Sequence, residues 1–308
     1  MTRISAESKG VYIIAVTPFH DNGAIDTASV DRMVDFYLDK GADGLTILGM
    51  MGEAPKLTQQ ESIDVTRQVI ARAAGKPVVV GVSAPGLAAI GELTKAVMDL
   101  GAAGVMVAPT AALRTDDQIL GYYRNVVATI GPDVPLVLQD FPLATGVQIS
   151  TRTIGAIIEA LPSMVMLKHE DWPGLDKISD LRDAEAAGRR RISILCGNGG
   201  VFLPEEMARG ADGAMTGFAY PEMMVDVVRL TNAGDMARAQ DLFDAYLPLA
   251  RFEQQPGLGL AVRKYVLAKR GAIASQAQRR PGASLGAKAV AEVDNLMARL
   301  DRRLAELA

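Results

Sequence analysis

The sequence is poor in the residues that build metal centres and disulfide frameworks. It contains one cysteine, Cys196, and two histidines, His20 and His169, among 308 residues. A single thiol excludes an intrachain disulfide and a cysteine-cluster metal site, and two separated histidines without an acidic cluster offer no ligand set. We therefore predict no metal, no cofactor and a reducing compartment, with the cytoplasm as the default location.

Long apolar runs and strong charge are also absent. No apolar run approaches the length of about 18 residues that a membrane span needs, and the opening segment, MTRISAESKGVY, lacks the apolar centre of a secretory signal. The formal net charge is −4, and the basic residues are scattered except for GRRR at 188–191. These features favour a small-molecule partner over nucleic acid or a membrane.

Short apolar segments recur along the first two thirds of the chain. Hydrophobic residues make up 49% of the sequence, which is ample for a folded core. Most of the segments are apolar without alternation, as expected for strands of a parallel sheet that is covered on both faces. The eight segments are 11–19, 44–49, 77–83, 104–109, 135–140, 165–170, 192–197 and 213–218.

Helical patterns alternate with these segments, and Thr58 with Glu61 predicts a capping box at the start of one of them. A weak repeat, KGADGLTILG, LGAAGVMVAP and RGADGAMTGF, ends a helix on one glycine and enters a strand on another. Eight such units predict a (β/α)₈ TIM barrel in the α/β class. An open doubly wound sheet is the alternative, and the absence of a G-x-G-x-x-G turn after the first segment disfavours it.

After Pro221 the pattern is purely helical, over 223–234, 236–252, 257–271 and 287–307. No Ser/Gly/Pro-rich linker separates this part from the preceding one. We therefore predict a barrel over 1–221 and a helical appendix over 222–308 that packs on it.

Lys168 ends the segment VMLKHE, where a charge is unwelcome, whereas the other nine lysines fall in predicted helices or loops. In a TIM barrel the carboxyl ends of the strands carry the chemistry, and desolvation there favours a neutral, nucleophilic amine. Glu170 points to the same side of the strand and can act as an acid/base partner or only neutralise the lysine. His169 faces the helical layer and is expected to be structural.

A second stretch, GMMGEAPKL at 49–57, places Gly49 and Gly52 around Met50 and Met51 at the end of the second strand. Glycines let backbone N–H groups turn inward to form a nest for a carboxylate. A plain turn from strand to helix is the alternative.

These stretches together resemble the dihydrodipicolinate synthase / N-acetylneuraminate lyase family of Schiff-base-forming barrels. GMMGE is similar to that family's G-[ST]-T-G-E loop and QDFPLATG to its Y-N-x-P-x-x-T-G segment. LKHE is similar to its lysine strand and GADGAMTG to its glycine-rich entry to strand eight. The motifs occur in the right order over roughly residues 8–300.

The resemblance implies that Lys168 forms an iminium with a 2-keto acid whose carboxylate is held by the backbone of Gly49, Met50 and Met51. It also implies a homo-oligomer, a dimer or a tetramer. Yet Met50 and Met51 replace the family's hydroxyls, Gln139 its tyrosine and Ala144 its arginine, and PTAA at 109–112 offers no phenol. The proton relay of the synthases is therefore missing.

A narrower resemblance is to the L-2-keto-3-deoxyarabonate dehydratase type, through QD-x-P-x-x-T-G, Lys-x-Glu and the C-terminal LPL. It implies a carbon–oxygen lyase that dehydrates a 2-keto-3-deoxy sugar acid. Glu170 would move the C3 proton, while Gln139, Asn198 and Thr216 would bind substrate hydroxyls or serve only the loops. The alternatives are a pyruvate-dependent aldolase or synthase, and a non-catalytic protein that binds a keto acid.

Overall fold

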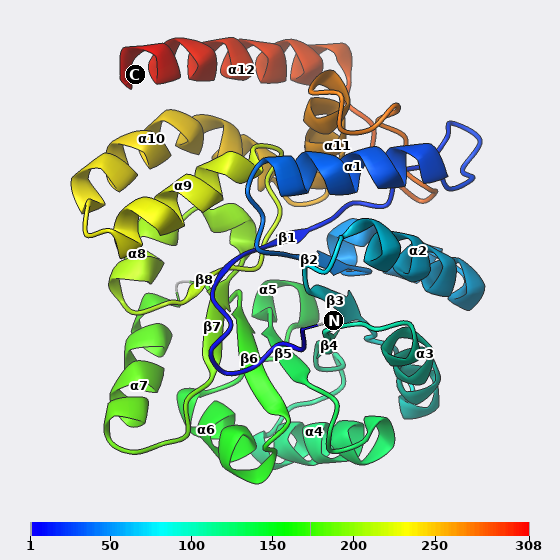
Figure 1. The fold of residues 1–308 in the computed structure, drawn as a ribbon, viewed down its shortest axis with the longest axis vertical. Coiled ribbons are helices and arrows are strands. Elements are labelled where there is room, and N and C mark those ends of the chain that lie inside the picture. The colour runs from blue at the N-terminus through cyan, green and yellow to red at the C-terminus, as the bar shows by residue number, and fades with distance from the viewer. Residues whose placement is uncertain (1, 173, 308) are drawn as a thin grey trace.

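The computed structural model describes residues 2–172 and 174–307 and shows a closed barrel of eight parallel strands in the order β1 to β8 (Figure 1). Each strand falls within or overlaps one of the eight predicted apolar segments, so the predicted (β/α)₈ barrel is confirmed. The strands are β1 Gly10–Ile14, β2 Gly44–Ile47, β3 Val78–Gly81, β4 Gly104–Val107, β5 Leu136–Asp140, β6 Met164–His169, β7 Ser193–Cys196 and β8 Gly213–Ala214.

Helices surround the barrel as the sequence pattern indicates, and the predicted capping box of Thr58 and Glu61 is formed. Two kinds of element were not predicted: the four-residue helix α5 and three 3₁₀ turns, all after strand ends. The turns are η1 Met50–Gly52, η2 Ala54–Lys56 and η3 Asn198–Gly200. The helices of this part are α1 Thr27–Asp39, α2 Gln59–Arg72, α3 Leu87–Asp99, α4 Asp116–Ile130, α5 Pro142–Thr145, α6 Thr151–Ala160, α7 Leu175–Ala186 and α8 Leu203–Ala208.

The apolar core is divided by the sheet into two layers. The larger cluster lies between the strands and the helices, and a smaller one fills the barrel. Along β6, Met166 belongs to the inner cluster and Leu167 to the outer one, which is the period of two expected for a strand. The N-terminal segment crosses one end of the barrel, where Ile4 joins the inner cluster and its N–H donates to the carbonyl of Ala103 (Figure 1). The opposite, carboxyl end of the strands is therefore the open end.

The three repeats owe their glycines to the turn between helix and strand. Gly41, Gly101 and Gly210 end their helices with φ of 88°, 98° and 94°, which L side chains rarely adopt. Gly213, at a strand entry, has no room for a side chain, since a Cβ there would lie 2.0 Å from the Gly10 carbonyl oxygen. The repeat therefore marks three helix-to-strand turns.

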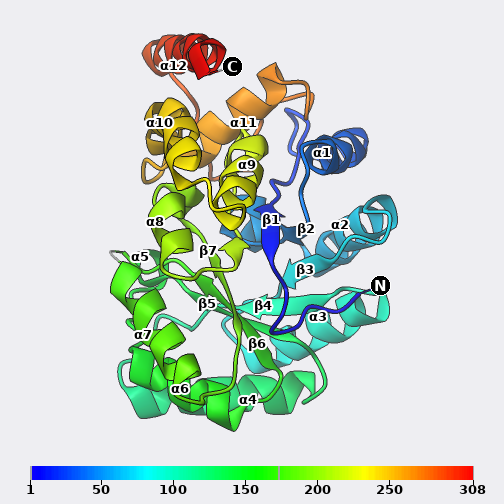
Figure 2. The ribbon, with the colours of Figure 1, turned by 60° about the vertical axis from the view of Figure 1, so that its left-hand side comes forward.

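The chain after β8 forms four further helices, which stack on one side of the barrel (Figure 2). The first of them packs on β1 and β8, the second packs between the first and the last, and the last lies farthest from the barrel (Figures 1 and 2). These helices are α9 Pro221–Asn232, α10 Met236–Glu253, α11 Gly259–Lys269 and α12 Ala287–Leu307. The division into 1–221 and 222–308 stays a prediction. No described helix combines the length and apolarity that crossing a membrane requires.

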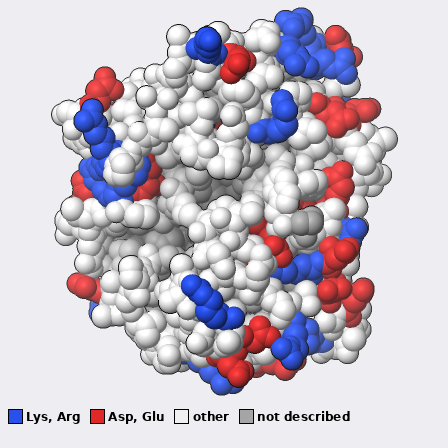
Figure 3. All heavy atoms as spheres, turned by 180° about the vertical axis from the view of Figure 1, so that it is seen from behind, with Lys and Arg blue, Asp and Glu red and all other residues white. Residues whose placement is uncertain are grey.

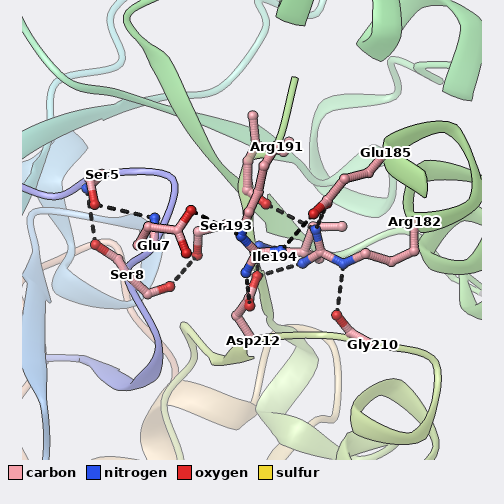
Figure 4. A network of polar contacts seen from close by, with 11 residues as sticks. Ser5, Glu7, Ser8, Arg182, Glu185, Arg191, Ser193, Ile194, Gly210 and Asp212 are labelled. Atoms are coloured by element: carbon pink, nitrogen blue, oxygen red, sulfur yellow. Dashed lines mark hydrogen bonds and ion pairs between the residues drawn. The ribbon is translucent and has the colours of Figure 1, made fainter. Parts of the chain in front are cut away.

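Arg190 and Arg191 of the basic run at 188–191 bind other groups of the same chain. Arg191 pairs with Asp212 Oδ1 and Arg182 with Asp212 Oδ2 (Figure 4). The N–H of Ile194 on β7 also donates to Oδ2, at 2.9 Å. Arg190 donates to the carbonyls of Ile158, Leu161 and Met164 at 2.7, 3.1 and 3.0 Å. These arginines therefore join α6, α7 and the last strands.

Glu206 of α8 gives a prediction for stability against pH. It is 6% exposed beside the Cys196 thiol, and burial raises its pKa to about 8. Between about pH 4.5 and 8 the folded protein keeps a proton that the unfolded chain has released, so this group lowers the free energy of unfolding as the pH rises. We expect the free energy of unfolding of Glu206→Gln to rise relative to that of the wild type by on the order of 4 kcal/mol across that window. Urea unfolding at several pH values measures the difference.

The adjacent Glu205 is exposed and provides a matched control. Glu205→Gln should keep most of the wild-type pH dependence, because burial is the largest cause of the raised pKa of Glu206 and the Glu205 charge is a smaller one. Parallel curves for Glu206→Gln and the wild type would show that the buried carboxyl does not hold its proton.

Candidate active site

Two neighbouring strands bring Gln139 and Lys168 together at the open end of the barrel. The two residues are register partners between β5 and β6. Each lies two residues beyond a member of the inner cluster, Val137 in β5 and Met166 in β6, so both side chains point into the barrel. Glu170 lies two residues after Lys168, so its side chain points to the same side of the chain, into the barrel.

Lys168, Glu170 and Gln139 form a buried polar trio. Lys168 Nζ lies 3.0 Å from Glu170 Oε2, and Gln139 Nε2 donates to the same oxygen at 2.7 Å. The residues are 4%, 6% and 4% exposed. The glutamate is thus held by a neutral donor on one side and reaches the amine on the other. A proton can pass between amine and carboxylate without crossing solvent.

A chamber of about 170 Å³, here called the lysine chamber, lies beside this trio. The amine is therefore neither exposed to bulk solvent nor closed in by its carboxylate partner. Every predicted site residue except Gly49 lines this chamber, and their roles stay predictions. Its lining residues are Ile14, Met50, Met51, Gln139, Phe141, Lys168, Glu170, Asn198, Gly199, Thr216, Gly217, Gln254 and Arg263.

The glycine-rich end of β7 makes room for Glu170. A Cβ at Gly197 would lie 2.2 Å from Glu170 Cγ. The next residue, Asn198, donates from Nδ2 to the Glu170 carbonyl at 3.0 Å, and the Gly199 N–H donates to Thr216 Oγ1 at 2.8 Å. Asn198 and Thr216 therefore already hold the loops together, while Thr216 keeps its hydroxyl proton free to donate to a ligand.

The turn η1 forms the wall opposite the β7 end. The Gly52 N–H donates to the Gly49 carbonyl at 3.0 Å, which closes the turn. The first amides of such a turn have no acceptor within it and are available to an anion. Gly49 itself lines an adjoining cavity of about 190 Å³ together with Met50 and Gln139. The backbone of η1 is thus suited to the predicted carboxylate nest. Gly49 itself lines the adjoining cavity and not the lysine chamber.

An outer chamber of about 670 Å³ leads to the lysine chamber. The two share Met50, Met51, Phe141, Asn198 and Gln254. Its wall includes the exposed apolar side chains of Leu143 and Trp172. The molecule seen from behind is hollowed near its centre, with uncharged atoms there and charged side chains toward the periphery (Figure 3).

Two consecutive cations on α11, Arg263 and Lys264, were missed by sequence reasoning. Lys264 is fully buried and donates to Glu53 Oε1 at 2.5 Å, to the Thr17 carbonyl at 2.8 Å and to the Ala277 carbonyl at 2.8 Å. Burial lowers its pKa, and the contact with Glu53 opposes that shift. The available signal was an Arg-Lys pair within a mostly apolar helix, GLAVRKYVLAK.

Arg263 is 2% exposed and reaches the lysine chamber from outside the barrel's own loops. Its Nε donates to Glu253 Oε1 at 2.6 Å, and its Nη2 donates to the Gly217 carbonyl. Its Nη1 has no partner among the described residues. The chamber therefore contains a second cation besides Lys168, with a donor left open.

His169 and Asp140 lie on the outer side of the same strands and do not line the lysine chamber. Burial lowers the pKa of His169 to about 4, and burial raises the pKa of Asp140 to about 6 although Lys177 opposes that shift. Lys177 Nζ lies 2.7 Å from Asp140 Oδ2. His169 is thus neutral and buried, in line with its expected structural role.

Metal ligands are sparse in the part of the chain that the structure describes. Within residues 2–172 and 174–307 no three His, Cys, Asp or Glu side chains come close enough to hold an ion. The chemistry available in the lysine chamber is that of an amine, a carboxylate, amides, a hydroxyl and a guanidinium.

Comparisons with known proteins agree on the family. The model of the Dihydrodipicolinate synthetase family matches residues 7–300. An L-2-keto-3-deoxyarabonate dehydratase of Azospirillum brasilense is 29% identical over 95% of this chain and 94% of its own. A 4-hydroxy-tetrahydrodipicolinate synthase of Thermomicrobium roseum is 32% identical over 79% of each chain. The crystal structure of a dihydrodipicolinate synthase from Rhodopseudomonas palustris is 54% identical, covers 97% of this chain and 100% of that one, and superposes with a TM-score of 0.96.

The buried pair of Lys264 and Glu53 gives a second stability prediction. Lys264→Met leaves Glu53 inside the protein without its fully buried partner, so we expect a loss of about 3 kcal/mol in the free energy of unfolding. Adding Glu53→Gln should recover part of that loss, because it removes a buried carboxylate that Lys56 alone would then neutralise. Urea unfolding of the wild type, the two single variants and the double variant measures the coupling.

Lys269→Met makes the same change on the same helix at an exposed pair with Asp294. Its cost should stay below about 1 kcal/mol. Equal losses in the free energy of unfolding for the two lysine variants would show that the buried pair contributes no more to stability than the exposed one.

Proposed function

The chain belongs to the dihydrodipicolinate synthetase family of Schiff-base lyases, and on that premise we propose that it dehydrates a 2-keto-3-deoxy sugar acid through Lys168. The observation that carries this proposal is the position of Glu170, 3.0 Å from the Lys168 amine and held there by Gln139. A carboxyl group in that place can serve both the amine and the carbons next to the iminium.

The first half of the proposed reaction activates the substrate. Glu170 takes the proton of the Lys168 ammonium, and the neutral amine attacks the C2 carbonyl of the keto acid. Glu170 returns the proton to the carbinolamine hydroxyl, which leaves as water, and a protonated iminium results. The iminium is an electron sink that acidifies the C–H bonds at C3.

The second half removes the C4 hydroxyl. Glu170 takes a C3 proton to give an enamine, and then gives that proton to the C4 hydroxyl as the C4–O bond breaks. Water leaves, and a C3–C4 double bond conjugated to the iminium remains. Hydrolysis of the iminium frees Lys168 and an unsaturated 2-keto acid, so the net change is the loss of one water.

The lining of the lysine chamber supports dehydration over aldol cleavage. Cleavage of the C3–C4 bond needs a base on the C4 hydroxyl, whereas dehydration needs an acid there. No tyrosine occurs among the described lining residues, Gln139 cannot take a proton from a hydroxyl, and Glu170, once it has taken the C3 proton, is an acid and not a base toward the C4 hydroxyl. The relationship to the Azospirillum dehydratase over nearly the whole chain points the same way.

Substrate size and binding complete the proposal. The lysine chamber, at about 170 Å³, suits a short keto acid of about five carbons, with its carboxylate on the amides of Met50 and Met51. Gln139, Asn198 and Thr216 are the proposed contacts for its oxygens. We further propose a cytoplasmic homo-oligomer, a dimer or tetramer, which light scattering would test.

A synthase that condenses pyruvate with an aldehyde is the second candidate. The named synthase structure from Rhodopseudomonas, at 54% identity, favours it. The chamber of this chain speaks against it, because the phenol relay expected of a synthase is absent from the described lining residues. A non-catalytic protein that binds a keto acid is the remaining alternative.

Product analysis separates these candidates. Incubation with each of the two C4 enantiomers of 4,5-dihydroxy-2-oxopentanoate should consume one of them without releasing pyruvate, as followed by proton NMR. Release of pyruvate with an aldehyde would indicate an aldolase. Conversion of pyruvate with aspartate semialdehyde would indicate a synthase.

Borohydride reduction with pyruvate should place a covalent adduct on Lys168, found by peptide mass analysis. Lys168→Arg should give none. Absence of an adduct on the wild type with pyruvate and with both pentanoates would leave only the non-catalytic alternative.

Glu170→Gln tests the proposed acid and base. The amide keeps the size and the contact with Gln139 but moves no proton, so we expect turnover to fall by about 10²–10⁴-fold. Asp171→Asn removes the next carboxylate, which lies outside the lysine chamber, and should stay near the wild type. Turnover by Glu170→Gln at the wild-type rate would assign the proton transfers to another group.

A further inference from the structure

Arg263 stands in the lysine chamber because Gly217 has no side chain. A Cβ at Gly217 would lie 2.2 Å from Arg263 Nη1 and 2.8 Å from its Cζ. Met215, two residues earlier, belongs to the inner cluster, so a side chain at position 217 would point into the barrel as well. The guanidinium thus takes the place that a side chain of the barrel itself would fill.

The guanidinium is fixed rather than mobile. Glu253 Oε1 accepts from Nε at 2.6 Å, and the other Glu253 oxygen accepts from the Ala219 N–H at 3.1 Å. The Gly217 carbonyl accepts from Nη2. The Gly217 carbonyl and the Glu253 carboxylate, itself held by the Ala219 N–H, therefore orient Arg263. Its remaining nitrogen, Nη1, is buried without a partner among the described residues.

A buried donor without an acceptor costs free energy, and a charged donor costs more than a neutral one. Most buried polar atoms in folded proteins have a partner, so one that lacks a partner calls for an explanation such as a catalytic role, a water or an ion. Here the unpaired donor belongs to a residue that lines the same chamber as the reactive lysine. A substrate oxygen at Nη1 would remove the penalty.

We propose that Arg263 is a specificity residue whose Nη1 donates a hydrogen bond to the terminal hydroxyl of the substrate chain. This inference rests on the proposed function, and it names the part of the substrate that α11 recognises. The C1 carboxylate has its own donors at η1, and C2 is bound to Lys168. The free end of a five-carbon chain is therefore the group left for Arg263.

Charge decides between a hydroxyl and a second carboxylate at that end. Glu253 already neutralises Arg263 at 2.6 Å. With substrate bound, the iminium balances one negative charge, yet both Glu170 and the C1 carboxylate are present. A second substrate carboxylate would add an uncompensated buried charge, whereas a hydroxyl adds none. The chamber therefore favours a neutral polyhydroxy chain end over a dicarboxylic acid.

The test compares two substrates that differ by one hydroxyl, 4,5-dihydroxy-2-oxopentanoate and 4-hydroxy-2-oxopentanoate. For the wild type we expect kcat/KM to favour the dihydroxy compound by at least about tenfold, because loss of one partner leaves the charged donor unpaired. A wild-type ratio near one overturns the proposal without any variant.

Arg263→Lys keeps the positive charge beside Glu253 and lacks Nη1, so the ratio should fall toward one. Arg251→Lys makes the same substitution at an exposed site on α10 and should keep the wild-type ratio. An equal loss for both substrates in Arg263→Lys would make the arginine merely structural.

Trapping with pyruvate separates the remaining outcomes, because pyruvate has the carboxylate and the ketone but no terminal hydroxyl. The wild type and Arg263→Lys should trap pyruvate on Lys168 at similar concentrations. A much weaker response in the variant would assign Arg263 to the C1 carboxylate and overturn the proposal. No adduct in the wild type would instead refute the Schiff-base function itself.

Discussion

The contact between the Lys168 amine and the Glu170 carboxylate, both buried at the barrel mouth, is the constraint around which the site is arranged. Taking two charges out of water is costly unless they meet each other and further hydrogen bonds. Gln139 supplies such a bond, and the parallel register of β5 and β6 sets it beside the lysine. The same pairing that permits the burial also allows a proton to move within it.

Missing side chains shape the chamber around that contact. Gly197 leaves the space that Glu170 occupies, and Gly217 leaves the space that Arg263 occupies. Gly199, with φ of 67°, lies against the side chain of Gln254, since a Cβ there would be 2.0 Å from Nε2. Two of these three gaps are filled by residues that follow the barrel, Arg263 of α11 and Gln254, which directly follows α10. Glycines of the barrel thus leave the space, and in two of the three cases a polar side chain from a distant part of the chain occupies it.

This division explains how far the sequence could lead. Apolar segments without alternation, separated by helical patterns, predicted the barrel, and the two-residue period of a strand placed Lys168 and Glu170 on one side. Gln139 was predicted only through the family resemblance. The glycines at 49 and 52 predicted a backbone nest, and the family resemblance assigned to it the carboxylate of a keto acid. Arg263 lies 95 residues after Lys168, and its approach depends on how α11 packs in the folded chain, which no local period encodes. Gly217 could be read from the sequence as a glycine after the eighth strand, but the sequence did not predict that Arg263 occupies the space beside it.

The two cations of α11 show why the C-terminal helices matter to the barrel's chemistry. Lys264 holds Glu53, the residue directly after η1, and so fixes the wall that carries Met50 and Met51. Arg263 holds the Gly217 carbonyl, three residues after β8, and so fixes the wall on the other side of β1. One short helix thus orients two walls of the lysine chamber through adjacent residues. Because the reactive pair is carried by the strands and these walls by α11, the family's common iminium chemistry and its choice of substrate can change separately.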